Sequence, residues 1–205
     1  MMDFKKDRKD LYQPTTAPSV VDVPAMVFLA VDGAGDPNTS PAYAAAIETL
    51  YGLSYGIKMA HKHVLEYVVP PLEGFWTGEG ASQSGVLDKD KLRWTAVIRQ
   101  PDFVTAEVLD DAKATLAKRK PALDVASARL ETLAEGLCVQ ILHVGSYDLE
   151  PASVAAMERF ATAQGYAIDL AGQRRHHELY LSDPRKTAPE KLKTILRHPV
   201  TLAVI

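Results

Sequence analysis

The chain has 205 residues, and its 26 acidic and 23 basic side chains give a formal net charge of −3. Its single cysteine excludes an internal disulfide and a zinc site built on several cysteines. The slightly acidic balance is unlike the basic surface of a general nucleic-acid binder, and no apolar run is long enough to suggest a membrane span.

Residues 1–18 form a polar lead that mixes both charges and contains two prolines. Because no apolar stretch of the kind found in secretory signals follows these charges, we predict a cytoplasmic protein. The domain itself is predicted to begin at residue 19 and to continue as one unit to residue 205.

The first half of this domain, residues 19–100, is divided by turn residues into a strand, a helix and further strands. β-Branched residues predict the first strand over 20–31, and Pro41 stands at a typical first helical position. The remaining predicted elements are a helix over 41–62 and strands over 63–69, 72–77 and 91–99.

The second half, residues 101–205, follows a similar plan. Its predicted elements are helices over 104–119 and 150–164 and strands over 127–133, 137–144, 174–181 and 199–205. This order of elements predicts an antiparallel α+β fold made of two β-α-β-β halves.

A glycine-containing turn between the first strand and the first helix is the one candidate for a phosphate-binding loop. Gly33-Ala34-Gly35 has the beginning of a dinucleotide fingerprint, but Asn38 stands where its third glycine belongs. Pro37 also removes a backbone N–H donor. The segment is therefore predicted to be a structural turn, and no cofactor is expected.

Two further catalytic motifs are incomplete. The segment 176–178 reads His-His-Glu, which lacks the spacing of a zinc-binding H-E-x-x-H helix, so no metal is expected. The segment 81–85 has alanine where the serine nucleophile elbow requires its first glycine.

The predicted strand over 174–181 is the most informative stretch of the sequence. On a strand Arg174, His176, Glu178 and Tyr180 share one face. Either this is a solvated outer face, or Glu178 points into a cleft lined by aromatic residues. Aromatic residues on or beside other predicted strands suit a pocket for flat or apolar ligands, although such residues also form ordinary cores; they are Tyr67, Trp76, Trp94 and Tyr147.

Several segments together resemble the GyrI-like small-molecule-binding proteins. They are residues 32–38, 72–76, 91–94, 135–147 and 177–184, and the resemblance runs in order from about residue 4 to the C-terminus. The resemblance implies two β-α-β-β modules related by a pseudo-twofold axis, with antiparallel sheets flanked by helices and a central ligand cleft. The family includes effector-binding domains of multidrug-responsive transcription regulators. Because the resemblance begins almost at the first residue, a stand-alone member without a DNA-binding region is expected.

The resemblance also implies a chemical role for individual residues. Glu178 matches a pocket glutamate that contacts cationic or polar ligands in the family. Stand-alone members with a similar Leu-Glu-Gly-x-Trp segment hydrolyse cyclopropane-bearing compounds that alkylate DNA, using that glutamate and a tyrosine. Here the glutamate is Glu178, as general base, and the best match for the tyrosine is Tyr67. Phe75 and Thr77 depart from the usual residues of that segment, which bears on substrate range.

Further residues are expected to line the ligand site, namely Trp76, Trp94, Tyr147, Tyr180, His143 and His176. Two other functions remain open: a protein that sequesters or senses small molecules without turnover, and a protein that interacts with DNA gyrase. A monomer or weak dimer is expected, with no direct contact to nucleic acid or membrane.

Overall fold

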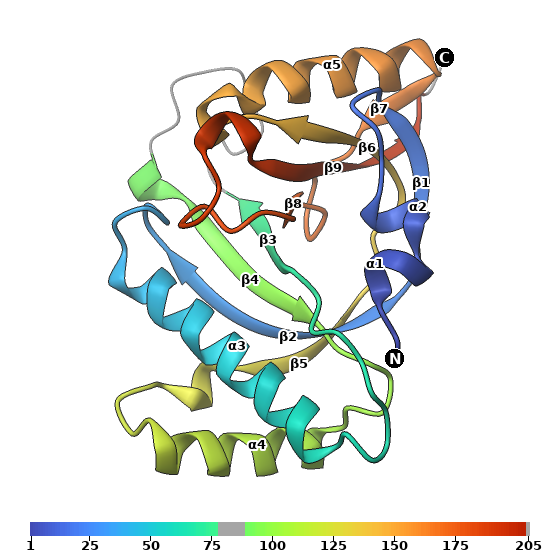
Figure 1. Ribbon diagram of the computed structural model, residues 1–205. Coiled ribbons are helices and arrows are strands. Elements are labelled where there is room, and N and C mark those ends of the chain that lie inside the picture. Colours follow the sequence, from blue (N-terminus) through green and yellow to red (C-terminus); the bar gives the residue numbers. More distant parts are fainter. Residues whose placement is uncertain (78–88, 204–205) are drawn as a thin grey trace.

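The computed structural model describes residues 1–77 and 89–203, and an antiparallel sheet of nine strands forms the centre of this part of the chain (Figure 1). From edge to edge the strands are β1 (Ser19–Val23), β6 (Gly136–Val144), β9 (Lys193–Leu202), β8 (His176–Tyr180), β3 (Leu72–Thr77), β4 (Arg93–Arg99), β2 (Met26–Ala34) and β5 (Arg129–Leu133), and β7 (Tyr166–Ile168) pairs with β9. The predicted antiparallel α+β fold is confirmed.

The sheet has a two-fold plan. β3 and β8 pair at its centre, β4 and β9 flank them, and β2 and β6 come next. The edge strands are exchanged, since β1 pairs with β6 rather than with β2, which follows it in the chain, and β5 pairs with β2 rather than β6. The two halves β2-α3-β3-β4 and β6-α5-β8-β9 therefore build one continuous sheet.

One face of the sheet is covered by three long helices. In Figure 1, α3 (Pro41–Ala60) and α4 (Ala106–Arg119) lie next to β2 and β5 at the bottom of the view. α5 (Glu150–Ala163) lies next to β6 and β9 at the top. α3 begins where the Ser40 side chain accepts a hydrogen bond from the Tyr43 backbone N–H, with proline at the first helical position. Its apolar side packs on β2 and β4, while α5 packs on β6 and β9 around Met157.

The opposite face is covered by the N-terminal segment. Two short helices, α1 (Phe4–Asp7) and α2 (Lys9–Tyr12), bury Phe4, Leu11 and Tyr12 in a cluster with Phe28 and Val97. Although residues 1–18 are polar on average, these three apolar side chains attach the segment to the sheet.

Three strand boundaries differ from the sequence predictions. The stretch 20–31 is two strands, because Pro24 stands between them and cannot donate a ladder hydrogen bond. Residues 63–69 form no regular strand; Tyr67 makes only an isolated bridge with Met2. The last strand begins at Lys193, earlier than predicted.

Short 3₁₀ turns connect several elements: η1 (Lys89–Lys91), η2 (Val125–Ser127), η3 (Tyr147–Leu149) and η4 (Pro189–Lys191). In the part of the chain with described coordinates, no helix is both long and apolar enough to cross a membrane. The segment 81–85, which resembles part of a nucleophile elbow, lies outside the described residues.

Candidate functional site

Glu178 lies at the centre of the sheet, on the face that carries the long helices. Its strand neighbours are Gly74 on β3 and Leu196 on β9, and Leu196 packs in the cluster beneath α5. The predicted alternation along β8 is correct: His176, Glu178 and Tyr180 share this face, whereas His177 points to the opposite face. The alternative of a solvated outer face is therefore wrong.

Both carboxylate oxygens of Glu178 are hydrogen-bonded by neighbours on the same strand. His176 Nε2 lies 2.8 Å from Oε1, and the Tyr180 hydroxyl donates to Oε2 at 2.6 Å. Trp76 Nε1–H in turn donates to the Tyr180 hydroxyl oxygen at 3.1 Å. The Glu178 side chain keeps 14% of its surface exposed.

Aromatic side chains from separate elements surround this carboxylate. Tyr43 on α3 lies edge-on to Trp94, with ring centroids 4.9 Å apart, and 6.0 Å from the Trp76 ring. Tyr147 lies edge-on to Tyr180 at 6.1 Å. Burial, and after it the negative charge of Glu178, raises the pKa of Tyr43 and Tyr180. These phenols are therefore neutral hydrogen-bond donors at physiological pH.

Gly74 provides the space in which two of these groups meet. A Cβ atom at this position would lie 2.9 Å from Trp76 Nε1 and 3.1 Å from the Tyr180 hydroxyl. Only glycine leaves room for the Trp76–Tyr180 hydrogen bond directly opposite Glu178.

A second carboxyl group, Glu150, is part of this site and was missed by the sequence analysis. It stands at the start of α5, is largely buried, and its Oε1 has no hydrogen-bond partner among the described residues. Burial, and then the charge of Glu178, raises the pKa of Glu150 well above its usual value. The site therefore combines a hydrogen-bonded carboxylate with a second carboxyl group that gives up its proton less readily, an arrangement that separates acid and base roles.

His176 also connects Glu178 to the outer surface of α5. His176 Nδ1 lies 2.7 Å from His198 Nε2, and His198 Nδ1 lies 3.7 Å from Oε1 of Glu158 on α5. His198 is fully buried, and burial followed by the charge of His176 lowers its pKa to about 3. This row of side chains lies between the sheet and α5, and it had no signal in the sequence.

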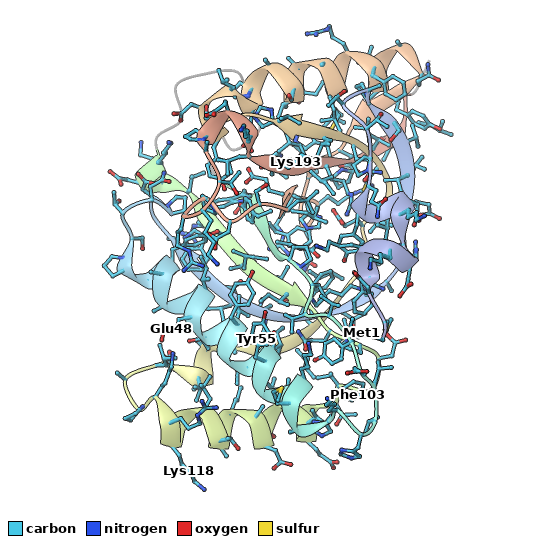
Figure 2. The ribbon with its side chains drawn as sticks, viewed as in Figure 1. Met1, Glu48, Tyr55, Phe103, Lys118 and Lys193 are labelled. Carbon is cyan, nitrogen blue, oxygen red and sulfur yellow. The ribbon has the colours of Figure 1, made fainter. Side chains whose placement is uncertain are left out.

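Two predicted site residues lie in other surroundings. Tyr67 is fully buried, with its ring 6.2 Å from that of Phe103, which Figure 2 labels near the end of α3. Its hydroxyl has no hydrogen-bond partner among the described residues. His143 joins β6 to the start of α5: its Nδ1 lies 2.9 Å from Ser153 Oγ and its Nε2 lies 3.0 Å from the Ser146 carbonyl oxygen.

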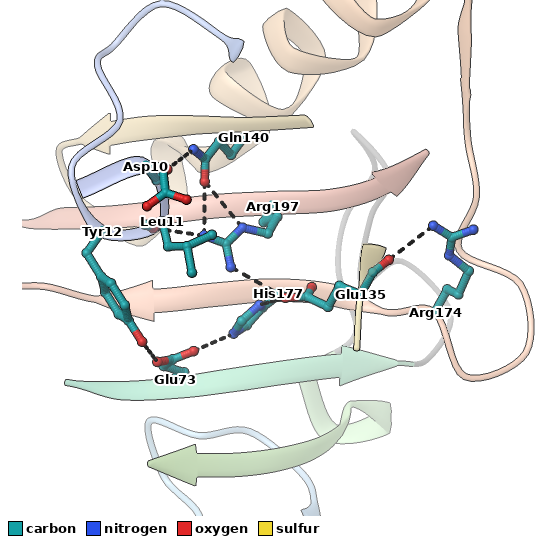
Figure 3. Close-up of polar contacts among 9 residues, drawn as sticks. All are labelled: Asp10, Leu11, Tyr12, Glu73, Glu135, Gln140, Arg174, His177 and Arg197. Atoms are coloured by element: carbon teal, nitrogen blue, oxygen red, sulfur yellow. Dashed lines mark hydrogen bonds and ion pairs between the residues drawn. The ribbon is translucent and has the colours of Figure 1, made fainter. Parts of the chain in front are cut away.

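A separate polar network occupies the opposite face of the sheet (Figure 3). His177 lies between two carboxylates, with Nε2 3.0 Å from Glu73 Oε2 and Nδ1 2.9 Å from Glu135 Oε1. Its ring stacks on Phe75 at 3.9 Å. The network extends to the N-terminal segment, because Tyr12 donates to Glu73 and Arg197 donates to the Leu11 carbonyl oxygen.

Charge compensation explains how this network is stable without solvent. Burial alone would lower the pKa of His177, but the charge of Glu135 and hydrogen bonds to both carboxylates raise it. Since the Glu73 and His177 side chains have no exposed surface, the network serves the fold rather than a ligand. Among the side chains with described positions, no group of three or more metal-binding residues is arranged to hold a metal ion.

Comparisons with known proteins agree with this architecture. The family model described as a GyrI-like small molecule binding domain matches residues 16–201. A crystal structure of an uncharacterized conserved protein from Listeria innocua is 46% identical, with a TM-score of 0.92, and the match covers 98% of this chain and 100% of that one. A hydrolase from the same organism is 44% identical, with a TM-score of 0.90 and the same coverage.

The fold also occurs in a more distant protein. The C-terminal domain of EcmrR shares 11% identity and a TM-score of 0.54, over 91% of this chain and 98% of that one, which is a similarity of fold. None of the curated proteins matches the chain.

Proposed function

Because the chain belongs to the GyrI-like small-molecule-binding domain family, we propose that its ligand reaches Glu178 and that the protein hydrolyses compounds bearing a reactive cyclopropane ring. The proposal rests on the environment of Glu178. Its carboxylate is partly exposed, is hydrogen-bonded to His176 and Tyr180, and is surrounded by aromatic side chains. The 44% identity to a Listeria innocua hydrolase over the whole chain supports a reaction with water. The cyclopropane class comes from the resemblance of the sequence motifs.

In the proposed reaction Glu178 is the general base. It removes a proton from a water molecule whose oxygen attacks a carbon of the strained ring. The carbon–oxygen bond forms as a ring carbon–carbon bond breaks, and the electron pair of the broken bond moves to an electron-withdrawing group conjugated with the ring. That group takes up a proton from solvent, and Glu178 releases the proton it had removed back to solvent. The product is therefore the substrate plus one water and no longer alkylates DNA.

We assign the accompanying tyrosine to Tyr180, because its hydroxyl contacts Glu178 directly. Trp76 fixes the direction of that hydroxyl, since an indole N–H can only donate and leaves the Tyr180 proton to point at the carboxylate. A role for Tyr67 remains a prediction that the same assay tests.

The proposal is tested by incubating a cyclopropane-bearing electrophile with the protein and measuring the mass of the ligand afterwards. We expect a product heavier by one water, and Glu178→Gln should lower turnover by about 10²–10⁴-fold while binding persists, because the amide is no base. Glu107→Gln on the exposed first turn of α4 is the control. If E178Q retained full turnover, Glu178 would not be the base.

The tyrosines are compared in the same assay. Tyr180→Phe should lower kcat, because it removes a hydrogen bond of 2.6 Å to Glu178, and Tyr67→Phe should leave kcat unchanged. The reverse pattern would return the role to Tyr67.

A binding protein without turnover is the second candidate. A carboxylate among the rings of Trp76, Tyr43 and Tyr147 also suits a cation, which gains from the charge and from the aromatic faces. In this case a cationic aromatic probe binds, E178Q weakens its binding, and the mass of the cyclopropane compound is unchanged after incubation.

A further inference from the structure

We propose that His198 is a positioning residue of this site: it fixes the tautomer and orientation of His176 so that an imidazole N–H points at Glu178, and Glu158 ends this row of groups on α5. The consequence for turnover rests on the proposed function, whereas the direction of the hydrogen bonds does not.

The distances leave one hydrogen between the two rings. His176 Nδ1 and His198 Nε2 are 2.7 Å apart, so one nitrogen carries the proton and the other accepts it. If His198 is the donor, His176 Nδ1 is the acceptor, and the proton of the His176 ring is on Nε2. This Nε2–H then points at Glu178 Oε1, and the two heavy atoms are 2.8 Å apart. With both rings neutral, the opposite arrangement would set a bare Nε2 lone pair against the carboxylate, which is repulsive.

The environment of His198 makes this direction stable. Its ring is fully buried, and burial, the larger cause of its lowered pKa, keeps it neutral, so it has one N–H to give. Among the residues with described positions its Nδ1 has no partner within hydrogen-bonding distance, and the carboxyl group of Glu158 lies beyond it at 3.7 Å. Burial raises the pKa of Glu158, which weakens the pull of its carboxyl group on the His198 proton.

The result is a carboxylate that receives two hydrogen bonds of defined direction. Trp76 directs the Tyr180 hydroxyl to one oxygen, and His198 directs His176 to the other. Glu150 is the further acidic group facing Glu178, and burial and the charge of Glu178 raise its pKa. Glu178 is thereby held in one orientation as an acceptor, which is what a general base requires.

The test uses ¹⁵N NMR of the histidine rings in His198→Met and His198→Gln. Methionine retains the bulk without a donor, whereas the glutamine amide can occupy the place of Nε2 and donate. In H198M we expect the His176 Nδ1 resonance to move toward that of a nitrogen without a hydrogen bond and the Nδ1–H tautomer to become populated. H198Q should retain the unaltered pattern, and unchanged His177 resonances show that the fold persists. A His176 spectrum that is unaffected by H198M, or an Nδ1–H tautomer in the unaltered protein, would overturn the proposal.

Should H198M fail to fold, Glu158→Gln is measured instead, because its amide can donate to His198 Nδ1 from the half-exposed face of α5 and no longer ionises. As the pH is raised, the unaltered protein should show a growing fraction of Nδ1–H on His198, and E158Q should show none. Equal behaviour of the two proteins overturns the role of Glu158.

Turnover is then measured on the same cyclopropane-bearing compound. H198M should lower kcat by about 10- to 100-fold with KM unchanged, which is the range expected for a lost hydrogen bond acting on a charged group, and H198Q should restore most of it. If H198M changes the His176 spectrum but not kcat, the positioning role of His198 is wrong, and the proposed hydrolysis is unaffected. If the unaltered protein leaves the compound intact, the proposed hydrolytic function is wrong. The NMR spectra alone then decide the direction of the hydrogen bond between His198 and His176.

Discussion

Glu150 is a residue whose role follows from its neighbours rather than from its position in the sequence. In the chain it is the acidic residue before Pro151 at a helix start, where acidic residues are common. In the folded protein it is enclosed by Glu178 on β8, Thr194 on β9 and Asp148 on η3. A buried acid without a hydrogen-bond partner at Oε1, beside a carboxylate, is costly to ionise, so it destabilises the fold wherever solvent favours its charged form.

Glu150→Gln is therefore expected to make the protein more stable at alkaline pH. Because the folded pKa of Glu150 is raised above the ordinary 4.5, the native state keeps full stability below that pH and loses it as the pH rises through the folded value. The amide removes this loss, with a gain of about 1 kcal/mol or more at pH 8 and little change at pH 4. Urea unfolding at the two pH values measures it, with Glu107→Gln as the exposed control. An equal effect of E150Q at both pH values would contradict the assignment.

At the scale of elements, the packing of β2 against β4 depends on a residue without a side chain. Gly33 lies opposite Trp94 in the register of the two strands, and a Cβ atom there would overlap the Trp94 indole. Gly33→Ala is expected to lower the free energy of unfolding by about 1–3 kcal/mol through overpacking. Gly56→Ala on α3 is the matched control: it meets no atom within 4 Å and should stabilise by about 0.5–1 kcal/mol. Denaturant unfolding followed by tryptophan fluorescence distinguishes them, and equal effects would show that the indole moves freely.

The elements also show which parts of the fold the sequence could predict. Alternation along β8 placed Glu178, His176 and Tyr180 on one face, because the two-residue period of a strand is local information. The contacts of Glu178 with Glu150 and Tyr43, and the exchange of β1 and β5 between halves, join segments far apart in the chain and leave no periodic signal. Residues 63–69 were predicted as a strand from their apolar residues, but Tyr67 is buried there without a strand partner beyond one bridge.

At the scale of the whole molecule, the His177 network joins segments that no single half contains. Glu73 belongs to the first half, His177 and Arg197 to the second, and Leu11 to the N-terminal segment. Both faces of the centre of the sheet therefore carry carboxylates bonded to histidine, but they differ in exposure. The Glu178 side chain keeps 14% of its surface exposed, whereas that of Glu73 has none and is bonded to Tyr12 and His177 (Figure 3). The sheet itself thus separates this network, which the N-terminal segment covers, from the candidate site on the other face.

This network should give the whole protein a stability maximum at mildly acidic pH. Glu135 has a lowered pKa, so its contribution is present above 4.5 and disappears as the pH falls below that value. His177 has a raised pKa, so its contribution is complete below 6.5 and disappears as the pH rises through its folded value. Both contributions coincide between these limits. His177→Gln should remove about 3–5 kcal/mol there, because Glu73 and Glu135 both lose their ion pair with His177 and, among the described residues, Glu135 keeps only Arg197. It should also expose the amide of Leu11 to hydrogen exchange. Urea unfolding across pH measures the free energy of unfolding, and hydrogen-exchange NMR measures the protection of the Leu11 amide. A stability maximum above pH 8 would contradict the role of the network in stability. Retained protection of Leu11 in H177Q would show that the network does not hold the N-terminal segment in place.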